Sequence, residues 1–186
     1  IYSPEELQKI LEAVRTHLPG LLPWAACAAF TGARVKELEM LRWESINFER
    51  GFVEVASTKI RTKARRLVPL PNALNAWLTP YRQEAGALTD YVDPRAALGR
   101  VAAQAQLALK DNAFRHSYIT YRVAETNDTA RVALECGNSP EIIFQHYREL
   151  VGPDDAAGWF GVFPSMIPIL DVNELAPADP HHTAIA

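Results

Sequence analysis

Residues 111–150 read DNAFRHSYITYRVAETNDTARVALECGNSPEIIFQHYREL, and this stretch decides the fold. Apolar residues recur at helical spacing in its first third, and either of its first two residues can cap that helix. A turn follows, after which Thr129 can cap a second helix that Gly137 ends. The segment 139–141, Ser-Pro-Glu, then supplies a cap, a proline at the first helical position and an acid in the first turn. The stretch therefore predicts three short helices in succession.

The chain before this stretch is also rich in helical signals. Residues 3–6, Ser-Pro-Glu-Glu, form a capping box with a proline just inside the helix, and apolar residues follow at helical spacing. The run 21–30 is apolar nearly all round, as in a buried helix. Further helices are expected to begin at Arg34 and to span residues 72–84 and 94–109.

Between residues 46 and 70 the apolar period changes. Residues 46–48 and 52–55 flank a turn at Gly51, which indicates a β-hairpin. Residues 67–70 can add a third strand, and Pro69 places it at a sheet edge or at a strand end. The sequence therefore predicts an α+β fold that is mainly α-helical, with a small three-stranded antiparallel sheet.

The composition fits one moderate domain of 186 residues with enough apolar content for a sizeable core. The two lone cysteines, Cys27 and Cys136, are typical of buried thiols in a reducing cytoplasm. The longest nearly apolar run, 21–30, is interrupted by Pro23 and is too short to span a bilayer. The chain begins at Ile1 without a charged-then-apolar leader, so we interpret it as a fragment of a longer, soluble, cytoplasmic protein.

The net charge of −3 conceals an uneven distribution. All 19 basic residues lie within residues 1–149 together with 17 acidic residues, and the other five of the 22 acids follow. The segment 59–66 carries five cations in eight positions: Lys59, Arg61, Lys63, Arg65 and Arg66. Such a run is usually a solvated loop, but a compact basic loop on a nearly neutral body is also typical of contact with a phosphate backbone.

Five features occur in order along the chain. They are the segment Thr31-Gly32-Ala33-Arg34-Val35-Lys36-Glu37, Lys59 near a hairpin tip, the triplet Val68-Pro69-Leu70, Arg115, and Tyr147, which follows Asn138 by nine residues. In this order they resemble the catalytic domain of the tyrosine recombinases, the phage integrase family. That family has a TG-x-R-x-x-E segment, a lysine in a β-turn before a VPL strand, an H-x-x-R segment, and a G-H segment nine residues before a nucleophilic tyrosine. The resemblance covers roughly residues 3–150.

The resemblance implies cleavage of DNA without a metal, ATP or another cofactor. Tyr147 would be the nucleophile and form a covalent 3′-phosphotyrosyl intermediate. Arg34 and Arg115 would contact the phosphate, because planar, permanently charged guanidinium forks suit bidentate contact with it. Lys59 would be the general acid for the departing 5′ oxygen, with Lys63 as the alternative on the same loop. The other four cations of the segment would bind DNA: Arg61, Lys63, Arg65 and Arg66.

Glu37 lies one helical turn after Arg34 and would orient a positively charged or amide partner. Each of these residues also has an ordinary structural interpretation. Arg34 can form a surface ion pair with Glu37 or Glu39, worth at most ~1 kcal/mol. A helical tyrosine such as Tyr147 is a core or surface aromatic in most proteins. Only the joint pattern favours the catalytic interpretation.

Two positions depart from the family pattern. Asn112 stands at the histidine of H-x-x-R, and Asn138 stands at the histidine, or sometimes tryptophan, after the glycine. Asparagine can donate a hydrogen bond to phosphate, but it does not exchange a proton near neutral pH. His116 and His146 each adjoin a catalytic position on a helix, where neighbouring side chains point about 100° apart, so we expect neither to enter the site. Loss of a general base typically costs ~10²–10⁴-fold in rate.

The leading hypothesis is therefore a tyrosine recombinase that performs site-specific recombination or integration of DNA in a mobile element. The alternative, motivated by Asn112 and Asn138, is a catalytically impaired relative that still binds DNA. A type IB topoisomerase-like activity and a helical domain unrelated to DNA are less favoured. The expected partners are double-stranded DNA and further copies of the chain in a synaptic tetramer, and a membrane is not among them.

The catalytic domain is expected to occupy residues 1–150. Residues 151–186 are interrupted by prolines and carry five acids and no Lys or Arg, yet Trp159–Leu170 is strongly apolar. Family members often pass a C-terminal segment to a neighbour, so this segment is a candidate for docking in trans, with docking in cis as the alternative. The end of the chain is expected to be disordered, and its His181-His182 pair is not expected to bind a metal.

Overall fold

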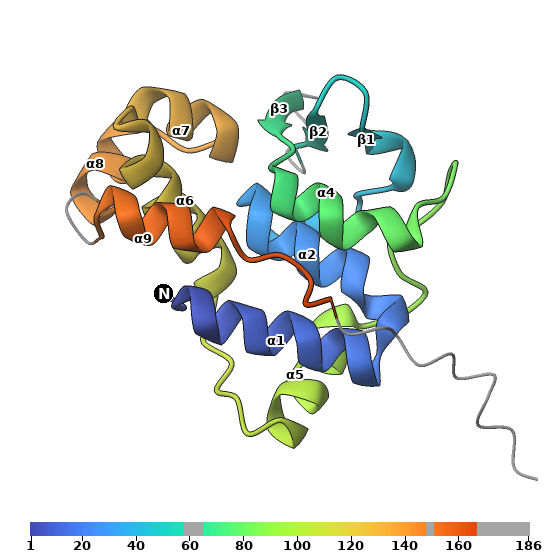
Figure 1. Ribbon diagram of the computed structural model, residues 1–186. Coiled ribbons are helices and arrows are strands. Elements are labelled where there is room, and N and C mark those ends of the chain that lie inside the picture. The colour runs from blue at the N-terminus through green and yellow to red at the C-terminus, as the bar shows by residue number, and fades with distance from the viewer. Residues whose placement is uncertain (58–64, 148–150, 167–186) are drawn as a thin grey trace, which may run out of the picture.

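The computed structural model describes residues 1–57, 65–147 and 151–166, except for the side chains of residues 146 and 147. Figure 1 shows α2 (Leu22–Thr31) in the middle of the molecule, with α1 (Pro4–His17) below it and the small sheet above it. The helices of the C-terminal part lie together on one side: α6 (Ala113–Thr126), α7 (Thr129–Cys136), α8 (Pro140–Tyr147) and α9 (Pro153–Phe160). This is the mainly α-helical α+β fold that the sequence predicts.

The helix α2 forms the centre of the core. All ten of its residues are buried, and α1, α4 (Asn72–Leu78) and α6 (Ala113–Thr126) pack around it. An apolar helix of this kind needs neighbours on every side, because each of its faces must be removed from water. The prediction of a buried helix at residues 21–30 is confirmed.

The capping box that starts α1 is also confirmed. Ser3 Oγ accepts a hydrogen bond from the Glu6 amide at 3.2 Å, and Glu6 Oε2 accepts one from the Ser3 amide at 2.8 Å. Each of these bonds satisfies an amide that the helix itself leaves without a partner.

The sheet consists of β1 (Ile46–Asn47), β2 (Phe52–Ala56) and β3 (Arg65–Pro69), paired antiparallel in that order. Gly51 lies in the turn between the first two strands with a φ of +69°. Pro69 is the last residue of β3, as its missing N–H predicts. The core face of the sheet consists of valines with zero exposure: Val53, Val55 and Val68.

Three predicted helices are shorter in the structure. The helix expected over residues 72–84 ends at Leu78 and continues only as a 3₁₀ turn, η3 (Thr79–Tyr81), because Pro80 has no N–H with which to continue the ladder. The helix expected over residues 94–109 is α5 (Pro94–Gln104). The helix expected to begin at Arg34 is a single turn, α3 (Val35–Leu38). Two further 3₁₀ turns lie before α2 and before the sheet: η1 (Pro19–Leu21) and η2 (Trp43–Ser45).

The stretch that decides the fold forms α6, α7 (Thr129–Cys136) and α8 (Pro140–Tyr147), as predicted. The cap of α7 differs from the prediction. Asp128, and not the threonine after it, accepts a hydrogen bond from the Arg131 amide at 2.9 Å, so the threonine is already the first helical residue. Asn112 precedes α6 in a left-handed conformation, with a φ of +52°, and no capping bond to its side chain is found among the described residues.

Residues 151–166 pack back onto the same chain. The helix α9 (Pro153–Phe160) lies against α6 and α1, where the fully buried Trp159 stacks on Tyr121 with 4.7 Å between the ring centroids. The Val162 carbonyl accepts a hydrogen bond from Trp77 Nε1 at 2.8 Å. The first half of the apolar segment thus packs against its own chain in this structure, docking in trans stays a prediction, and residues 167–186 lie outside the described part of the chain.

Cys27 and Cys136 are both buried thiols, as the sequence predicts, and burial raises the pKa of each to about 12. Among the described residues, every helix is too short or too polar to reach across a lipid bilayer.

Candidate active site

The C-terminal end of α7 is the framework of the candidate site. Gly137 has a φ of +60° and ends the helix in a Schellman motif. In this motif the Gly137 amide donates to the Leu134 carbonyl at 3.3 Å, and the Asn138 amide donates to the Ala133 carbonyl at 2.9 Å. These two bonds leave the next three carbonyls available as acceptors: those of Glu135, Cys136 and Gly137.

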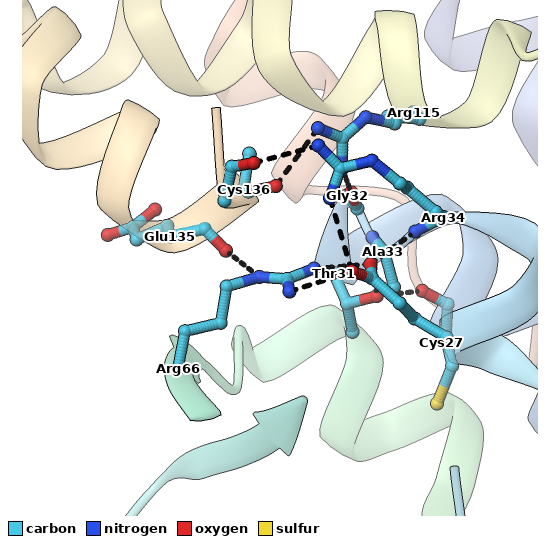
Figure 2. Close-up of polar contacts among 11 residues, drawn as sticks. Cys27, Thr31, Gly32, Ala33, Arg34, Arg66, Arg115, Glu135 and Cys136 are labelled. Carbon is cyan, nitrogen blue, oxygen red and sulfur yellow. Dashed lines mark hydrogen bonds and ion pairs between the residues drawn. The ribbon is translucent and has the colours of Figure 1, made fainter. Parts of the chain in front are cut away.

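Each of the three carbonyls accepts a hydrogen bond from a different arginine (Figure 2). Arg66 Nε donates to the first at 2.8 Å, Arg115 Nη2 to the second at 2.9 Å, and Arg34 Nη2 to the third at 2.7 Å. The arginines come from β3, from α6 and from the residue that precedes α3, respectively. Cations are stabilised at this end of a helix, where the unpaired carbonyls are negative. The end of α7 therefore gathers three guanidinium groups from three separate parts of the chain.

A buried carboxylate joins two of these arginines. Arg66 donates from Nη1 and Nη2 to the two oxygens of Glu37 at 3.1 and 2.6 Å. Arg34 donates to the same carboxylate from Nη1 at 3.1 Å and from its backbone amide at 2.8 Å. The Glu37 side chain is only 2% exposed. The expectation that Glu37 orients a cation is confirmed, and it has two such partners.

The pKa of Glu37 reflects this surrounding. Burial disfavours its charged form, but the hydrogen bonds from Arg66 and from the Arg34 amide, together with the two positive charges, outweigh burial and leave the pKa of Glu37 below its ordinary value. For Arg115, burial is the main cause that lowers the pKa, and the nearby charges of Arg34 and Arg66 lower it further. An arginine nonetheless stays protonated in proteins, so the cluster remains positively charged.

The Thr31-Gly32-Ala33 turn holds Arg115 from the other side. Arg115 Nη1 donates to the Gly32 carbonyl, and Gly32 itself has a φ of +60°. A Cβ atom at this position would lie 2.5 Å from Tyr118 Cδ1, so the close approach of α6 requires glycine. The threonine hydroxyl donates to the Cys27 carbonyl at 2.7 Å and accepts from the alanine amide at 3.3 Å, which fixes the turn.

A cavity of about 620 Å³ opens beside the arginines, and its lining includes Arg34, Arg115, Asn112 and His116. His116 was expected to stay away from the catalytic site, and this expectation stays a prediction although His116 lines the cavity. His116 lies one helical turn after Asn112, to whose carbonyl its amide donates at 3.0 Å. Residues spaced in this way share a helix face. That spacing was the signal in the sequence that could have placed His116 here.

Two adjacent cations of the basic loop point in opposite directions, because side chains alternate along a strand. Arg65 is 71% exposed and pairs with Glu54 at 3.0 Å. Arg66 is 12% exposed and points to Glu37 and to α7. Both residues were predicted to bind DNA, and the inward contacts of Arg66 were not predicted. The signal was Val68, a core position two residues further along the same strand.

The other predicted residues are located only in part. Tyr147 is the last residue of α8, and its side chain lies outside the described residues. Asn138 is half-buried directly after the turn at Gly137. Three predicted residues lie outside the described part of the chain: Lys59, Arg61 and Lys63. Within residues 1–57, 65–147 and 151–166, no group of three His, Cys, Asp or Glu side chains is placed to hold a metal ion.

The chain is similar to known proteins in both sequence and fold. A family model described as "Phage integrase family" matches residues 2–133. Tyrosine recombinase XerC of Xanthomonas axonopodis pv. citri (strain 306) is 29% identical over 174 residues, which covers 80% of this chain and 56% of that protein. The chain thus spans little more than half the length of this relative.

Solved structures share the fold. The crystal structure of XerA recombinase has a TM-score of 0.65 at 19% identity, with 83% of this chain and 61% of that one covered. The catalytic domain of bacteriophage HP1 integrase has a TM-score of 0.61 at 18% identity, with 78% and 84% covered. The XerH recombinase in a post-cleavage complex with its difH substrate has a TM-score of 0.56 at 19% identity, with 80% and 50% covered.

Proposed function

This chain belongs to the phage integrase family, and on that premise we propose that the protein containing it is a site-specific tyrosine recombinase. In this proposal it cleaves and rejoins double-stranded DNA in the recombination or integration of a mobile element, acts in the cytoplasm, and uses no metal or other cofactor. The observation that carries the proposal is the placement of Arg34 and Arg115 on adjacent carbonyls of α7, beside one cavity.

The charges of the cluster support the binding of a phosphodiester. Arg34, Arg66 and Arg115 bring three positive charges, of which Glu37 neutralises one. A guanidinium group has five N–H donors, and Arg34 remains 43% exposed although it already contacts Glu37 and α7. Donors fixed in place in this way favour the state in which negative charge develops on the non-bridging oxygens.

In the proposed reaction, Tyr147 attacks the phosphorus atom with its phenolic oxygen and loses its proton to solvent. The bond between phosphorus and the 5′ oxygen breaks, and Lys59 gives a proton to the departing oxygen, with Lys63 as the alternative donor. Asn112 and Asn138 contribute hydrogen bonds to the phosphate. A 5′ hydroxyl then attacks the phosphotyrosyl bond, which releases the tyrosine and restores a phosphodiester.

The proposed partner is double-stranded DNA. XerH was solved with its difH substrate, and lambda integrase was solved as a dimer on a core site. We expect Arg61, Lys63 and Arg65 to contact the DNA backbone of this chain's own site, and we expect copies of the protein to assemble as a synaptic tetramer on DNA.

The second candidate function is DNA binding by a catalytically impaired relative. It is favoured by Asn112 and Asn138, which occupy the two family histidine positions and do not accept a proton near neutral pH. The presence of Arg34, Arg115 and Tyr147 favours the enzyme, because DNA binding alone does not need a nucleophile.

Covalent trapping on a nicked substrate tests the proposal. The substrate is taken from the ends of the protein's own element, with a nick placed so that the 5′ fragment diffuses away after cleavage. The full-length protein should then accumulate an adduct with DNA that survives SDS, and Tyr147→Phe should form none. Asn112→His with Asn138→His is tested beside them.

The outcomes separate the two functions. An adduct with the wild-type protein that is lost only in Tyr147→Phe establishes the recombinase. DNA binding without an adduct, with the adduct restored by the two histidines, establishes the impaired relative. An absence of both binding and adduct in every variant rejects both.

A further inference from the structure

Arg66 has the surroundings of an internal residue although it belongs to a basic loop. It is 12% exposed, and its register partner on β2 is the fully buried Val55. The preceding residue, Arg65, is 71% exposed and pairs with the half-buried Glu54. A long cation with so little exposure is poorly placed to reach a DNA backbone.

The contacts of Arg66 satisfy three acceptor atoms. Its two Nη atoms donate to both oxygens of Glu37 at 3.1 and 2.6 Å, and its Nε donates to the Glu135 carbonyl at 2.8 Å. Of the three side-chain contacts to Glu37, Arg66 makes two, including the shortest, at 2.6 Å, and the Arg34 side chain makes the third, at 3.1 Å. Arg66 therefore neutralises most of a buried acid that would otherwise be left to Arg34 alone.

The hydrogen bond from Arg66 Nε to Glu135 places Arg66 beside the residues that bind the other two guanidinium groups. The carbonyl it binds, that of Glu135, directly precedes the carbonyls that bind Arg115 and Arg34. A Cβ atom on Gly137 would lie 3.3 Å from Arg66 Nη1, so Arg66 also packs against the turn that leads from α7 into α8.

We propose that Arg66 is a positioning residue, which holds the phosphate-binding guanidinium of Arg34 through Glu37 and through the end of α7, and which does not itself contact DNA. The proposal rests on the recombinase function proposed above. It replaces the DNA-binding role that the basic loop suggests for this position. Without Arg66, the Arg34 guanidinium becomes the sole cationic partner of a buried carboxylate and turns away from the phosphate.

The test compares Arg66→Ala and Arg66→Lys with wild type in the full-length protein, on the nicked substrate. DNA affinity is measured against salt concentration, and single-turnover cleavage is measured at saturating DNA. We expect Arg66→Ala to cleave about 10–100-fold more slowly, since misplacement of a catalytic group by about 1 Å costs on the order of 10²-fold. Its affinity and the salt dependence of that affinity should match wild type.

Arg66→Lys shows whether the planar shape of the Arg66 guanidinium or only its positive charge is needed for cleavage. A lysine keeps the charge but cannot form the planar fork that binds both oxygens of Glu37 and the carbonyl together. We therefore expect Arg66→Lys to remain impaired in cleavage. If Arg66 were a DNA contact, the lysine would restore most of the binding.

Two control variants show what the loss of a DNA contact and the loss of an arginine outside the site would look like. Arg65→Ala shows what the loss of an exposed loop cation does, with weaker binding and a salt slope reduced by about one. Arg42→Ala removes another exposed, ion-paired arginine, which lies 57% exposed outside the candidate site. It should cleave as wild type.

A substrate with a neutral methylphosphonate at the cleaved position separates misplacement of Arg34 from a general loss of folding. The readout is the cleavage defect of Arg66→Ala on this substrate compared with its defect on the ordinary phosphodiester. The methylphosphonate lacks the charge that Arg34 neutralises, so the defect of Arg66→Ala should shrink on it to less than about threefold. Partial unfolding would slow both substrates equally, and the thermal midpoint of each variant is measured as well.

The proposal is overturned if Arg66→Ala cleaves as wild type, if its defect is in affinity and is repaired by lysine, or if the defect is equal on both substrates. If Arg66→Ala does not fold, Arg66→Lys decides by the same measurements. An absence of adduct with the wild-type protein would reject the recombinase function instead, so the two failures are distinguishable.

Discussion

Arg34 and Arg115 donate to the carbonyls of two adjacent residues, Gly137 and Cys136, at 2.7 and 2.9 Å. Adjacent Cα atoms lie about 3.8 Å apart, so a single peptide unit sets the spacing of the two anchoring points. Arg34 directly precedes α3 and Arg115 lies in α6, and the end of α7 brings them to the same place.

Replacement of Arg115 by lysine should slow cleavage without unfolding the protein. An ammonium group cannot bind the Gly32 and Cys136 carbonyls together while it also presents a fork to the phosphate. We expect single-turnover cleavage to fall by about 10²–10³-fold, the range found for loss of one donor to a developing oxyanion. Arg100→Lys, at an exposed position on α5, is the matched control. An Arg115→Lys rate within threefold of wild type would contradict the role.

Gly32→Ala should destabilise the fold far more than Gly51→Ala. Both glycines have a positive φ, +60° and +69°, so both substitutions cost about 1 kcal/mol in backbone strain. A Cβ on Gly32 would also lie 2.5 Å from Tyr118 Cδ1, whereas none of the described residues has an atom within 4 Å of a Cβ on Gly51. Overpacking adds about 1–3 kcal/mol. Urea unfolding measures both variants, and equal losses would contradict the close packing at Gly32.

Acid should destabilise the protein through its buried carboxylates. The pKa of Glu37 is lowered as described above, and the pKa of Glu135 is also lowered, because hydrogen bonds and charges from Arg122 and Arg131 outweigh its burial. Because the pKa of each carboxyl group is lower in the folded state, the unfolded state binds more protons in acid. The stabilisation by the ionised Glu37 and Glu135 is therefore complete well above about pH 4.3, the ordinary pKa of a glutamate in an unfolded chain. It is lost as the pH falls through the folded-state values.

Urea midpoints measured between pH 7 and pH 3 check this dependence. Glu37→Gln should be less stable than wild type at pH 7 and should lose less stability on acidification, because one of the titrating groups is gone. A variant with the same acid dependence as wild type would show that Glu37 does not contribute to it.

Trp159→Ala should reveal how far the fold depends on α9. Trp159 is fully buried and stacks on Tyr121, so its truncation should cost about 3–5 kcal/mol. Phe163→Ala is the control, because Phe163 lies three residues after α9 and is 45% exposed. A loss below about 1 kcal/mol for Trp159→Ala would indicate that α9 leaves this chain in solution. Calorimetry of both variants gives the answer.

The elements with strong local signals could be predicted from the sequence. The capping box before α1, the glycine that ends α7 and the alternation along β2 and β3 are all decided by residues close to one another in the chain. The errors concern the cap of α7 and the lengths of α3, α4 and α5. The end of α4 has a local cause in Pro80, whereas for α3 and α5 the surroundings of the segment decide how far the helix continues.

The sequence singled out Arg34 and Arg115, which the structure brings to adjacent carbonyls, but it did not predict the contacts that connect them. The order of Arg34, Arg115 and Tyr147 along the chain gave the family, since the motif lies in the sequence itself. The inward direction of Arg66 depends on which face of β3 is buried. The three arginines bind successive carbonyls at the end of α7 through contacts between segments far apart in the chain. A local sequence pattern does not predict such contacts.

The Schellman turn at Gly137 also constrains the length of the segment between Ala133 and Asn138. Successive residues of a helix are rotated by about 100°, so one inserted residue between Ala133 and Asn138 would turn each carbonyl away from its arginine. The length of this short segment is therefore fixed by three partners at once. When parts of different recombinases are joined, a crossover in the connection between α5 and α6 would separate Arg34 and Arg66 from Arg115 and from all three carbonyls, so both parents would need the same segment length.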